Sequence, residues 1–270
     1  MSVDRAEPPD GAARRRLASG RDDLLVREEP LLLVVHGQPL LTMRTPGRDE
    51  DLALGFLLGE GIVAGAGDIA AMQAVAGDAE AQRADELRVT LHREPDALVR
   101  SRLARTHEVR SSCGVCGLTS APAILDGTPP LLPGVPRLAA ARLHELAAAL
   151  RARQALFAAT GGCHGALVAG ADGTELGFGE DVGRHNALDK AIGQAARRGA
   201  ELARAVAVLS GRAGFDLVLK CLRVRIPVVA SVSAPSALAF DLCEAAGATL
   251  VGFVRDGRHE VYCGADRLLA

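Results

Sequence analysis

Residues 205–257 read AVAVLSGRAGFDLVLKCLRVRIPVVASVSAPSALAFDLCEAAGATLVGFVRDG. Short apolar runs, typical of buried strands, alternate here with segments of helical periodicity. In chain order these are strand 205–210, helix 215–224, strand 226–233, helix 236–247 and strand 249–257. Such alternation is typical of parallel strands joined by right-handed crossovers. We therefore predict an α/β fold, with residues 258–263 (RHEVYC) returning as an antiparallel edge strand.

The preceding sequence supplies further elements. We predict a hairpin that begins at residue 165 and turns at Asp172–Gly173, because Asp-Gly favours a tight turn. Further helices are expected over 49–59, 138–160 and 184–198, and further strands over 27–44 and 84–94. The domain prediction has four parts. They are a disordered tail (1–26), an N-terminal α+β lobe (27–105), a CxxC loop with a Pro/Gly-rich connector (106–137), and a C-terminal α/β lobe (138–270).

Composition narrows the possible functions. The chain has 270 residues and a formal net charge of -2, so it lacks the basic field that nucleic-acid binders show. No run of about 18 apolar residues predicts a membrane span, and the first residues lack the apolar core of a secretion signal. Six cysteines in so long a chain indicate reduced thiols in the cytoplasm. Only two of the 31 basic residues are lysines, Lys190 and Lys220, which indicates either that a compact ammonium is needed there or that these two lysines survived by chance.

The stretch SSCGVCG, residues 111–117, places Cys113 and Cys116 three apart between glycines. A zinc site needs four ligands, and no second pair follows at the spacing of a zinc ribbon. An iron–sulfur site needs more clustered cysteines. A redox dithiol stays open, although the flanking sequence has little helical pattern. The other open reading is a sulfur carrier, in which one thiol holds a persulfide and the other attacks it.

Ligands of such sheets bind beyond the carboxyl ends of the strands, which selects the loops 209–214, 231–236 and 253–258. Backbone N–H groups of the first two can cradle an anion, with Arg212 gripping it. Arg184 and His185, near the start of the helix over 184–198, oppose the helix dipole. They indicate either an anionic ligand or an internal salt-bridge network. His164 is either a general acid or a hydrogen-bonded loop residue.

Several stretches together resemble one family, the formate dehydrogenase accessory sulfurtransferases. In family order these stretches are LALGFLLGEGIV (52–63), SCGVCG (112–117), TGGCHGA (160–166), EDVGRHNALDK (180–190), SGRAGFDLVLK (210–220), SAPSALA (233–239) and LVGFVRDGR (250–258). The resemblance runs from about residue 28 to the C-terminus. It implies a C-terminal lobe similar in fold to the three-layer cytidine deaminases, without their zinc ligands.

The resemblance also implies a sulfur relay in the cytoplasm. A cysteine desulfurase loads Cys113 with a persulfide, Cys116 assists, and the sulfur passes to a molybdenum or tungsten bis-molybdopterin guanine dinucleotide before that cofactor enters formate dehydrogenase. The implied partners are the desulfurase, formate dehydrogenase and a second copy of the chain, with no structural metal. The implied cofactor-binding segment consists of Phe253, Val254, Arg255, Asp256, Gly257 and Arg258. We add Arg212, His185 and Lys190 as secondary candidates.

The chain departs from the family pattern at Leu118, where a basic residue is common, and at Gly214, where a small polar residue is usual. Cys163 is given no chemical role. Two competing hypotheses remain. One is a chaperone that binds the cofactor or the apo-dehydrogenase without carrying sulfur. The other is a zinc-dependent deaminase, for which the ligand pattern is missing.

Overall fold

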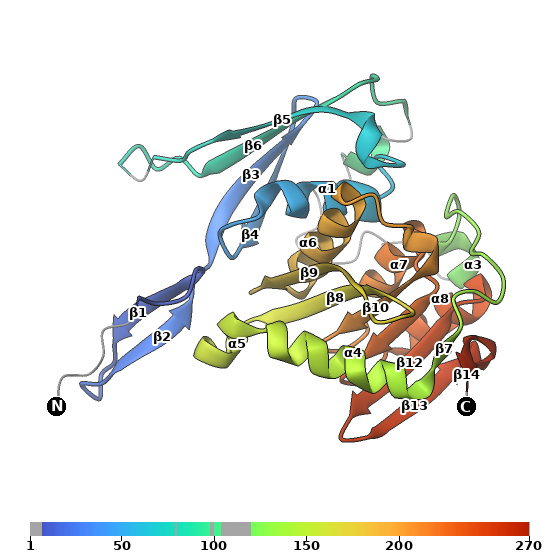
Figure 1. Ribbon diagram of the computed structural model, residues 1–270. Coiled ribbons are helices and arrows are strands. Elements are labelled where there is room, and N and C mark those ends of the chain that lie inside the picture. Colours follow the sequence, from blue (N-terminus) through green and yellow to red (C-terminus); the bar gives the residue numbers. More distant parts are fainter. Residues whose placement is uncertain (1–6, 79, 98–99, 104–119, 270) are drawn as a thin grey trace.

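The computed structural model describes residues 7–78, 80–97, 100–103 and 120–269 (Figure 1). Its centre is a six-stranded sheet with the order β13-β12-β11-β10-β8-β9. The strands are β8 (His164–Gly170), β9 (Glu175–Asp181), β10 (Ala205–Leu209), β11 (Val228–Ser231), β12 (Thr249–Arg255) and β13 (Arg258–Cys263). β10, β11 and β12 run parallel, while the other pairings are antiparallel. The predicted alternation and the antiparallel edge strand are both confirmed.

Helices cover both faces of this sheet (Figure 1). One face packs on α4 (Ala140–Arg153), and the other packs on α6 (Arg184–Arg197), α7 (Phe215–Arg223) and α8 (Ala237–Ala246). Strand alternation decides which side chain meets which layer. In β10, Val206 and Val208 join the cluster of α4, whereas Ala207 and Leu209 join that of the other helices. The C-terminal part of the chain is therefore a three-layer α/β/α unit.

Glycines let helix α6 approach its neighbours closely. A Cβ added at Gly177 or Gly179 of β9 would lie 2.1 or 2.0 Å from a carbonyl oxygen of α6. On the opposite side, α6 crosses α1 (Asp49–Gly59). A Cβ at Gly55 of α1 would lie 1.8 Å from Asp189 O, and one at Gly193 of α6 would lie 1.9 Å from Asp51 O. Backbone packs on backbone at this crossing, so α1 is tied to the large sheet.

Beyond α1 lies a four-stranded sheet with the order β4-β3-β6-β5. Its strands are β3 (Glu29–Val35), β4 (Gln38–Arg44), β5 (Ile69–Val75) and β6 (Asp85–Leu91). Leu31, Leu33 and Val35 of β3 are buried in the same hydrophobic cluster as α1 and α6. The N-terminal lobe and the C-terminal lobe thus share one core. β5 has no counterpart in our sequence-based assignment.

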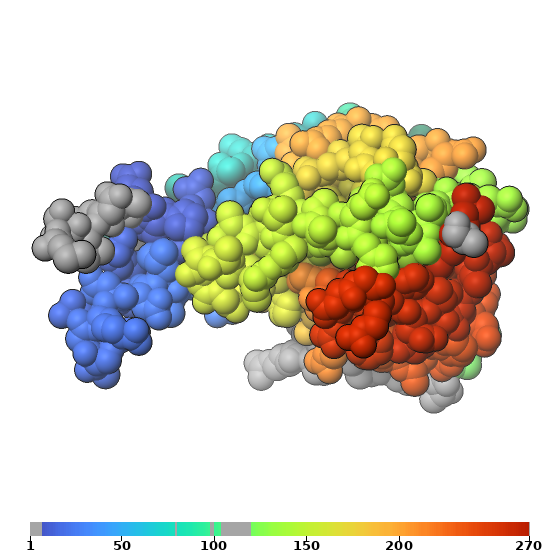
Figure 2. Space-filling model, turned by 60° about the horizontal axis from the view of Figure 1, so that its bottom comes forward, coloured from blue at the N-terminus to red at the C-terminus, as the bar shows by residue number. Residues whose placement is uncertain are grey.

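The N-terminal tail is a correction. We expected residues 1–26 to be disordered, but β1 (Ala12–Arg16) and β2 (Asp22–Val26) form an antiparallel hairpin that projects from the body (Figures 1 and 2). Opposite charges face each other across it, with Arg16 Nη1 3.3 Å from Asp22 Oδ1. At its base Ala12 and Val26 pack on helix α5 (Ala155–Thr160). The many charged residues of this segment led us to predict disorder and not strand pairing. Residues 1–6 lie outside the described residues.

The single helix expected over 138–160 is two helices, α4 and α5, separated at the buried Gln154. The Gln154 side chain lies over Gly165 at the start of β8, where a Cβ would be only 2.9 Å away. The remaining elements are short. They are α3 (Ala121–Ile124), η1 (Ala66–Asp68), η2 (Leu202–Arg204), η3 (Ala265–Arg267), and the paired β7 (Leu138–Ala139) and β14 (Leu268–Leu269). Across the described ranges, each helix is too short or too polar to cross a membrane.

Candidate functional site

A cavity of about 860 Å³ opens at the carboxyl ends of β10, β11 and β12. One wall consists of the turns that follow these strands, at Ser210–Gly211, Val232 and 254–257. The opposite wall comes from α4 and α5, and residues 161–164 complete it. A sheet with parallel central strands places its ligand site at this edge. The cavity therefore lies where the strand–helix alternation predicted a ligand.

His164 is positioned by the pairing of β8 with β10. Because these strands are antiparallel, the start of β8 meets the end of β10. Gly165 N donates to Ser210 Oγ at 2.8 Å, and Ser210 N donates to Gly165 O at 3.0 Å. The His164 ring lies against Gly211, where a Cβ would be 3.4 Å from Nδ1. Burial, together with the charges of Arg184 and His185, lowers the pKa of His164, so its imidazole enters the cavity neutral at pH 7.

The basic pair at the start of α6 is matched by an acid of this chain. Arg184 Nη2 lies 3.1 Å from Asp216 Oδ2, and His185 Nε2 contacts the same oxygen. Burial acts to raise the pKa of Asp216, but the His185 hydrogen bond and charge, the Leu217 N–H and Arg184 lower it to about 2. The internal salt-bridge network is thus present. Neither Arg184 nor His185 lines the cavity.

The segment 253–258 has an unusual backbone. Phe253 has φ +54°, a left-handed conformation that is rare for a bulky residue, and its N–H donates to Ser233 O at 3.1 Å. The pairing of β12 with β13 shifts register between Gly252 and Arg255. This geometry leaves the Phe253 ring 37% exposed, with the Arg255 guanidinium carbon 5.7 Å from the ring centroid.

Six consecutive residues from Phe253 border two adjoining hollows. Val254 is buried, and its neighbours Arg255, Asp256 and Gly257 join it in lining the cavity. A smaller hollow of about 520 Å³ is bordered by Phe253, Arg255, Gly257 and Arg258 together with His259 and Glu260. The turn at Asp256–Gly257 has φ +53° and +71°. Their role in binding the cofactor stays a prediction.

The other secondary candidates lie elsewhere. Arg212 is exposed in the turn after β10, next to Gly211 but not in the cavity wall. Lys190 is 2% exposed, with Nζ 2.8 Å from both Asp181 Oδ2 and Thr45 O. Lys220 is also buried, with Nζ 3.0 Å from Asp189 Oδ1 and from Glu60 Oε1. Both lysines place a compact ammonium between packed layers, which supports a structural role for them over chance survival; cofactor binding by Lys190 stays a prediction.

The cysteines divide into two groups. Cys113 and Cys116 lie in 104–119, outside the described residues. Cys163 lines the cavity, but it is 4% exposed and its Sγ donates to Glu180 Oε1 at 3.3 Å. Burial and then the Glu180 carboxylate raise the pKa of the Cys163 thiol, so it stays protonated and weakly nucleophilic. In the ranges that the structure describes, no three His, Cys, Asp or Glu residues are grouped to hold a metal ion.

This cavity can bind an anion that carries a planar ring. It contains two guanidinium groups, those of Arg151 and Arg255, each near an aromatic ring, with Arg151 Cζ 4.6 Å from the centroid of Phe157. Guanidinium groups bind phosphate oxygens, and exposed aromatic faces stack on planar bases. The wall of α4 and α5, which contributes His144, Arg151 and Phe157, was not predicted from the sequence. The i, i+7 spacing of His144 and Arg151, beside the buried Leu143 and Leu150, is the signal that could have found it.

Comparisons with known proteins agree on one family. A family model described as FdhD/NarQ matches residues 26–269. The sulfur carrier protein FdhD of Anaeromyxobacter dehalogenans strain 2CP-C is 43% identical over 287 residues, covering 99% of this chain and 97% of that protein. The sulfur carrier protein FdhD of Nocardia farcinica is 45% identical over 252 residues, covering 92% and 89%. A solved structure from Desulfotalea psychrophila, described as a formate dehydrogenase accessory protein, has a TM-score of 0.72 at 24% identity and covers 96% of this chain and 97% of its own, which shows a shared fold.

Proposed function

The chain belongs to the FdhD/NarQ family, and from this membership we propose that it is a sulfur carrier for the maturation of formate dehydrogenase. One observation carries the proposal. Relatives named sulfur carrier protein FdhD match the chain over nearly its whole length at more than 40% identity. The two cysteines of SSCGVCG supply the thiols that such a carrier needs.

The proposed first step loads sulfur onto Cys113. A cysteine desulfurase presents a persulfide, and the Cys113 thiolate attacks its outer sulfur. The S–S bond of the donor breaks as a new one forms on Cys113, and the donor leaves as a thiolate that takes up the proton. One neutral sulfur atom moves, and no external oxidant or reductant is needed.

The proposed second step delivers sulfur to the acceptor. Once the acceptor is bound, the Cys116 thiol attacks the inner sulfur of the Cys113 persulfide, which forms a Cys113–Cys116 disulfide and releases the outer sulfur as sulfide. The acceptor is the molybdenum or tungsten bis-molybdopterin guanine dinucleotide, which is cargo here. The disulfide must then be reduced by cellular thiols, which fits a reaction in the reducing cytoplasm. In this sense the protein is a sulfurtransferase.

The cavity at the strand ends is the proposed seat of that acceptor. Its guanidinium groups, Arg151 and Arg255, suit the phosphates of a dinucleotide, and the exposed Phe253 ring at the adjoining hollow suits a guanine base. The neutral His164 can exchange hydrogen bonds with the acceptor without adding charge. We also propose that this three-layer unit is similar in fold to the cytidine deaminases. We expect the functional form of the protein to be a homodimer.

A chaperone without sulfur transfer is the second candidate. One feature of the cavity favours this candidate. Among the described residues that line the cavity, Cys163 is the one cysteine, and its raised pKa keeps the thiol protonated, so the lining is suited to binding a ligand and not to nucleophilic attack on it. The discriminating experiment compares Cys113→Ala with Cys163→Ala as a matched control, in cells that depend on the protein for formate dehydrogenase activity. The carrier predicts that Cys113→Ala abolishes that activity while guanine-nucleotide binding persists. Normal activity in Cys113→Ala would favour the chaperone.

A further inference from the structure

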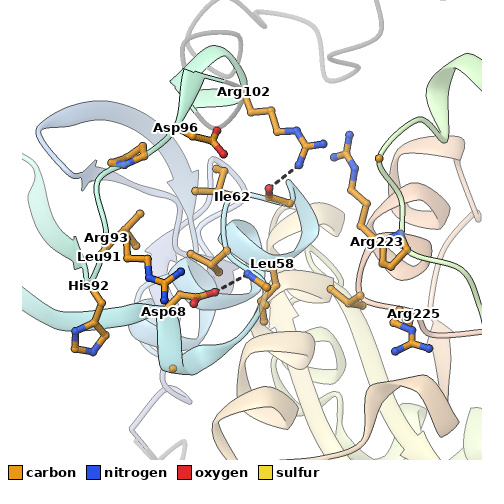
Figure 3. Close-up of a pocket in the computed structure, with 18 of the residues that line it drawn as sticks. Leu58, Ile62, Asp68, Leu91, His92, Arg93, Asp96, Arg102, Arg223 and Arg225 are labelled. Carbon is orange, nitrogen blue, oxygen red and sulfur yellow. Dashed lines mark hydrogen bonds between the residues drawn. The ribbon is translucent and has the colours of Figure 1, made fainter.

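A second cleft lies near the amino ends of β10 and β11, on the side of the large sheet opposite the first cavity. It is bounded by the end of α7 and by the loops after α1 and β6 (Figure 3). Its volume is about 1030 Å³. Four arginines line it, Arg93, Arg102, Arg223 and Arg225, and we call it the arginine cleft. Its floor is apolar, and the floor includes Ile62, Val63 and Leu91. The cleft therefore combines a cationic rim with a hydrophobic base.

The positive charge of the rim is only partly matched within the chain. Figure 3 shows Arg102 and Arg223 reaching toward each other from opposite walls. Arg102 Nη1 donates to Gly61 O at 2.6 Å, and Arg223 Nη1 lies 3.0 Å from Glu60 Oε2. The ion pairs of the described residues give no carboxylate partner to Arg93, Arg102 or Arg225.

Three acidic side chains line the cleft, Asp68, Glu94 and Asp96, and the first two have partners other than the cleft arginines. Asp68 Oδ2 accepts from Ala64 N at 2.7 Å and from Gly65 N at 3.1 Å. Glu94 Oε1 lies 3.0 Å from His36 Nε2. Among the described residues, no ion pair joins a carboxylate to Arg93, Arg102 or Arg225, so these guanidinium groups can still receive an incoming anion.

Arg225 is held in a costly position. It follows α7 with φ +65°, a left-handed conformation in which glycine is the favoured residue after a helix. Its Nε donates to Pro130 O at 3.1 Å, and the side chain is half-buried at the cleft. A glycine here would avoid the strain, so helix termination does not itself require an arginine at this position.

The cleft is also next to both ends of the cysteine-bearing segment. Arg102 precedes Cys113 by eleven residues, and Gly127, which lines the cleft as well, follows Cys116 by eleven. A protein that delivers sulfur to Cys113 must approach the chain that joins these two points. The arginines are therefore placed to meet that protein.

We propose that the arginine cleft docks the sulfur-donating protein by receiving a segment that pairs carboxylates with an apolar anchor. The rim supplies the charge complementarity, and the floor supplies the hydrophobic contact. Complementary charge raises the rate of association and weakens with added salt. This inference rests on the proposed function, because it names the surface through which the carrier is loaded.

The test measures the initial rate of sulfur loading by intact-protein mass, from two donors. One donor is a cysteine desulfurase with cysteine, and the other is glutathione persulfide, which needs no protein docking. The variants are Arg225→Glu and the exposed Arg93→Glu, with Arg198→Glu as a control of equal charge change outside the cleft. We expect the ratio of desulfurase rate to persulfide rate to fall about tenfold in the two cleft variants, and to stay within about twofold in the control.

The outcomes separate the two claims. If wild type is loaded by both donors and the cleft variants keep its ratio, the docking inference is wrong and the proposed function stands. If neither donor loads wild type, the proposed function fails and takes the inference with it. Binding of inorganic phosphate that is lost in the cleft variants, with the ratio unchanged, would assign the cleft to a small anion and overturn the inference. Thermal unfolding of each variant excludes misfolding, and Arg93→Glu carries the test if Arg225→Glu does not fold.

Discussion

The crossing of α1 and α6 yields a sharp prediction through Gly55→Ala. In an exposed helix this change would stabilise, because alanine exceeds glycine in helix propensity by about 1 kcal/mol. Here the new Cβ would lie 1.8 Å from Asp189 O, whereas real contacts almost never fall below 3.0 Å. The obstacle is backbone, so no side chain can rotate away. The two helices must separate by about 1.2 Å or bend.

The magnitude follows from these opposing terms. Overpacking of a close contact costs about 1–3 kcal/mol, and the upper end applies because backbone must move. Helix propensity offsets about 1 kcal/mol of this cost, which leaves a net loss of about 2 kcal/mol. In a chain of this size, that loss lowers the melting temperature by roughly 4–8 °C.

Urea unfolding followed by circular dichroism measures the effect. The matched control is Gly67→Ala, because an added Cβ there meets nothing within 4 Å. We expect the control to change the free energy of unfolding by less than about 0.5 kcal/mol. The reasoning is refuted if Gly55→Ala is as stable as wild type or more stable, since the close helix crossing would then not exist.

Three further predictions concern buried charge, pH and strain. Lys190→Met leaves Asp181 buried without its cation and should cost about 3–5 kcal/mol in urea unfolding, whereas a loss below 1 kcal/mol would show that the pair is dispensable. The folded pKa of Asp216 is about 2, below its unfolded value of about 3.9, so its stabilisation is complete above that value and is lost as pH falls toward 2. Between pH 5 and pH 3, Asp216→Asn should therefore lose less stability than wild type, and parallel losses would contradict the network with His185. Phe253→Gly should change the free energy of unfolding by less than about 1 kcal/mol relative to wild type, because glycine relieves the left-handed φ at this position. Calorimetry should nevertheless show weaker binding of a guanine nucleotide. Unchanged binding would remove Phe253 from the site.

The elements that the sequence predicted well are those whose pattern is local. Strands and helices alternate in 205–257 in the order that their hydrophobic periodicity predicted, and Asp172–Gly173 makes the expected turn. The hairpin β1–β2 was missed because it depends on the pairing of two charged strands and on packing against α5, which composition does not show. The break at Gln154 was missed for a similar reason, since it depends on contact with Gly165, which lies on β8.

The candidate site divides along the same line. The position of the site at the carboxyl ends of the parallel strands was predictable, because strand order and crossover direction place the ligand-binding loops there. The wall from α4 and α5 was predictable only in part: the spacing of His144 and Arg151 marks one face of α4, but the way these helices pack across β8 is not local to the sequence. The two lysines of a chain that otherwise uses arginine lie at buried positions, where one ammonium contacts several oxygens, but the sequence did not show whether they bind a ligand or support the fold.

Intact-protein mass spectrometry tests the sulfur-carrier function most directly. Wild type, Cys113→Ala and Cys116→Ala are each incubated with a cysteine desulfurase and cysteine, and then weighed before and after reduction. The account predicts an addition of about 32 Da that is lost on reduction, present in wild type and Cys116→Ala but absent in Cys113→Ala. The same addition in Cys113→Ala, or none in wild type, would contradict it.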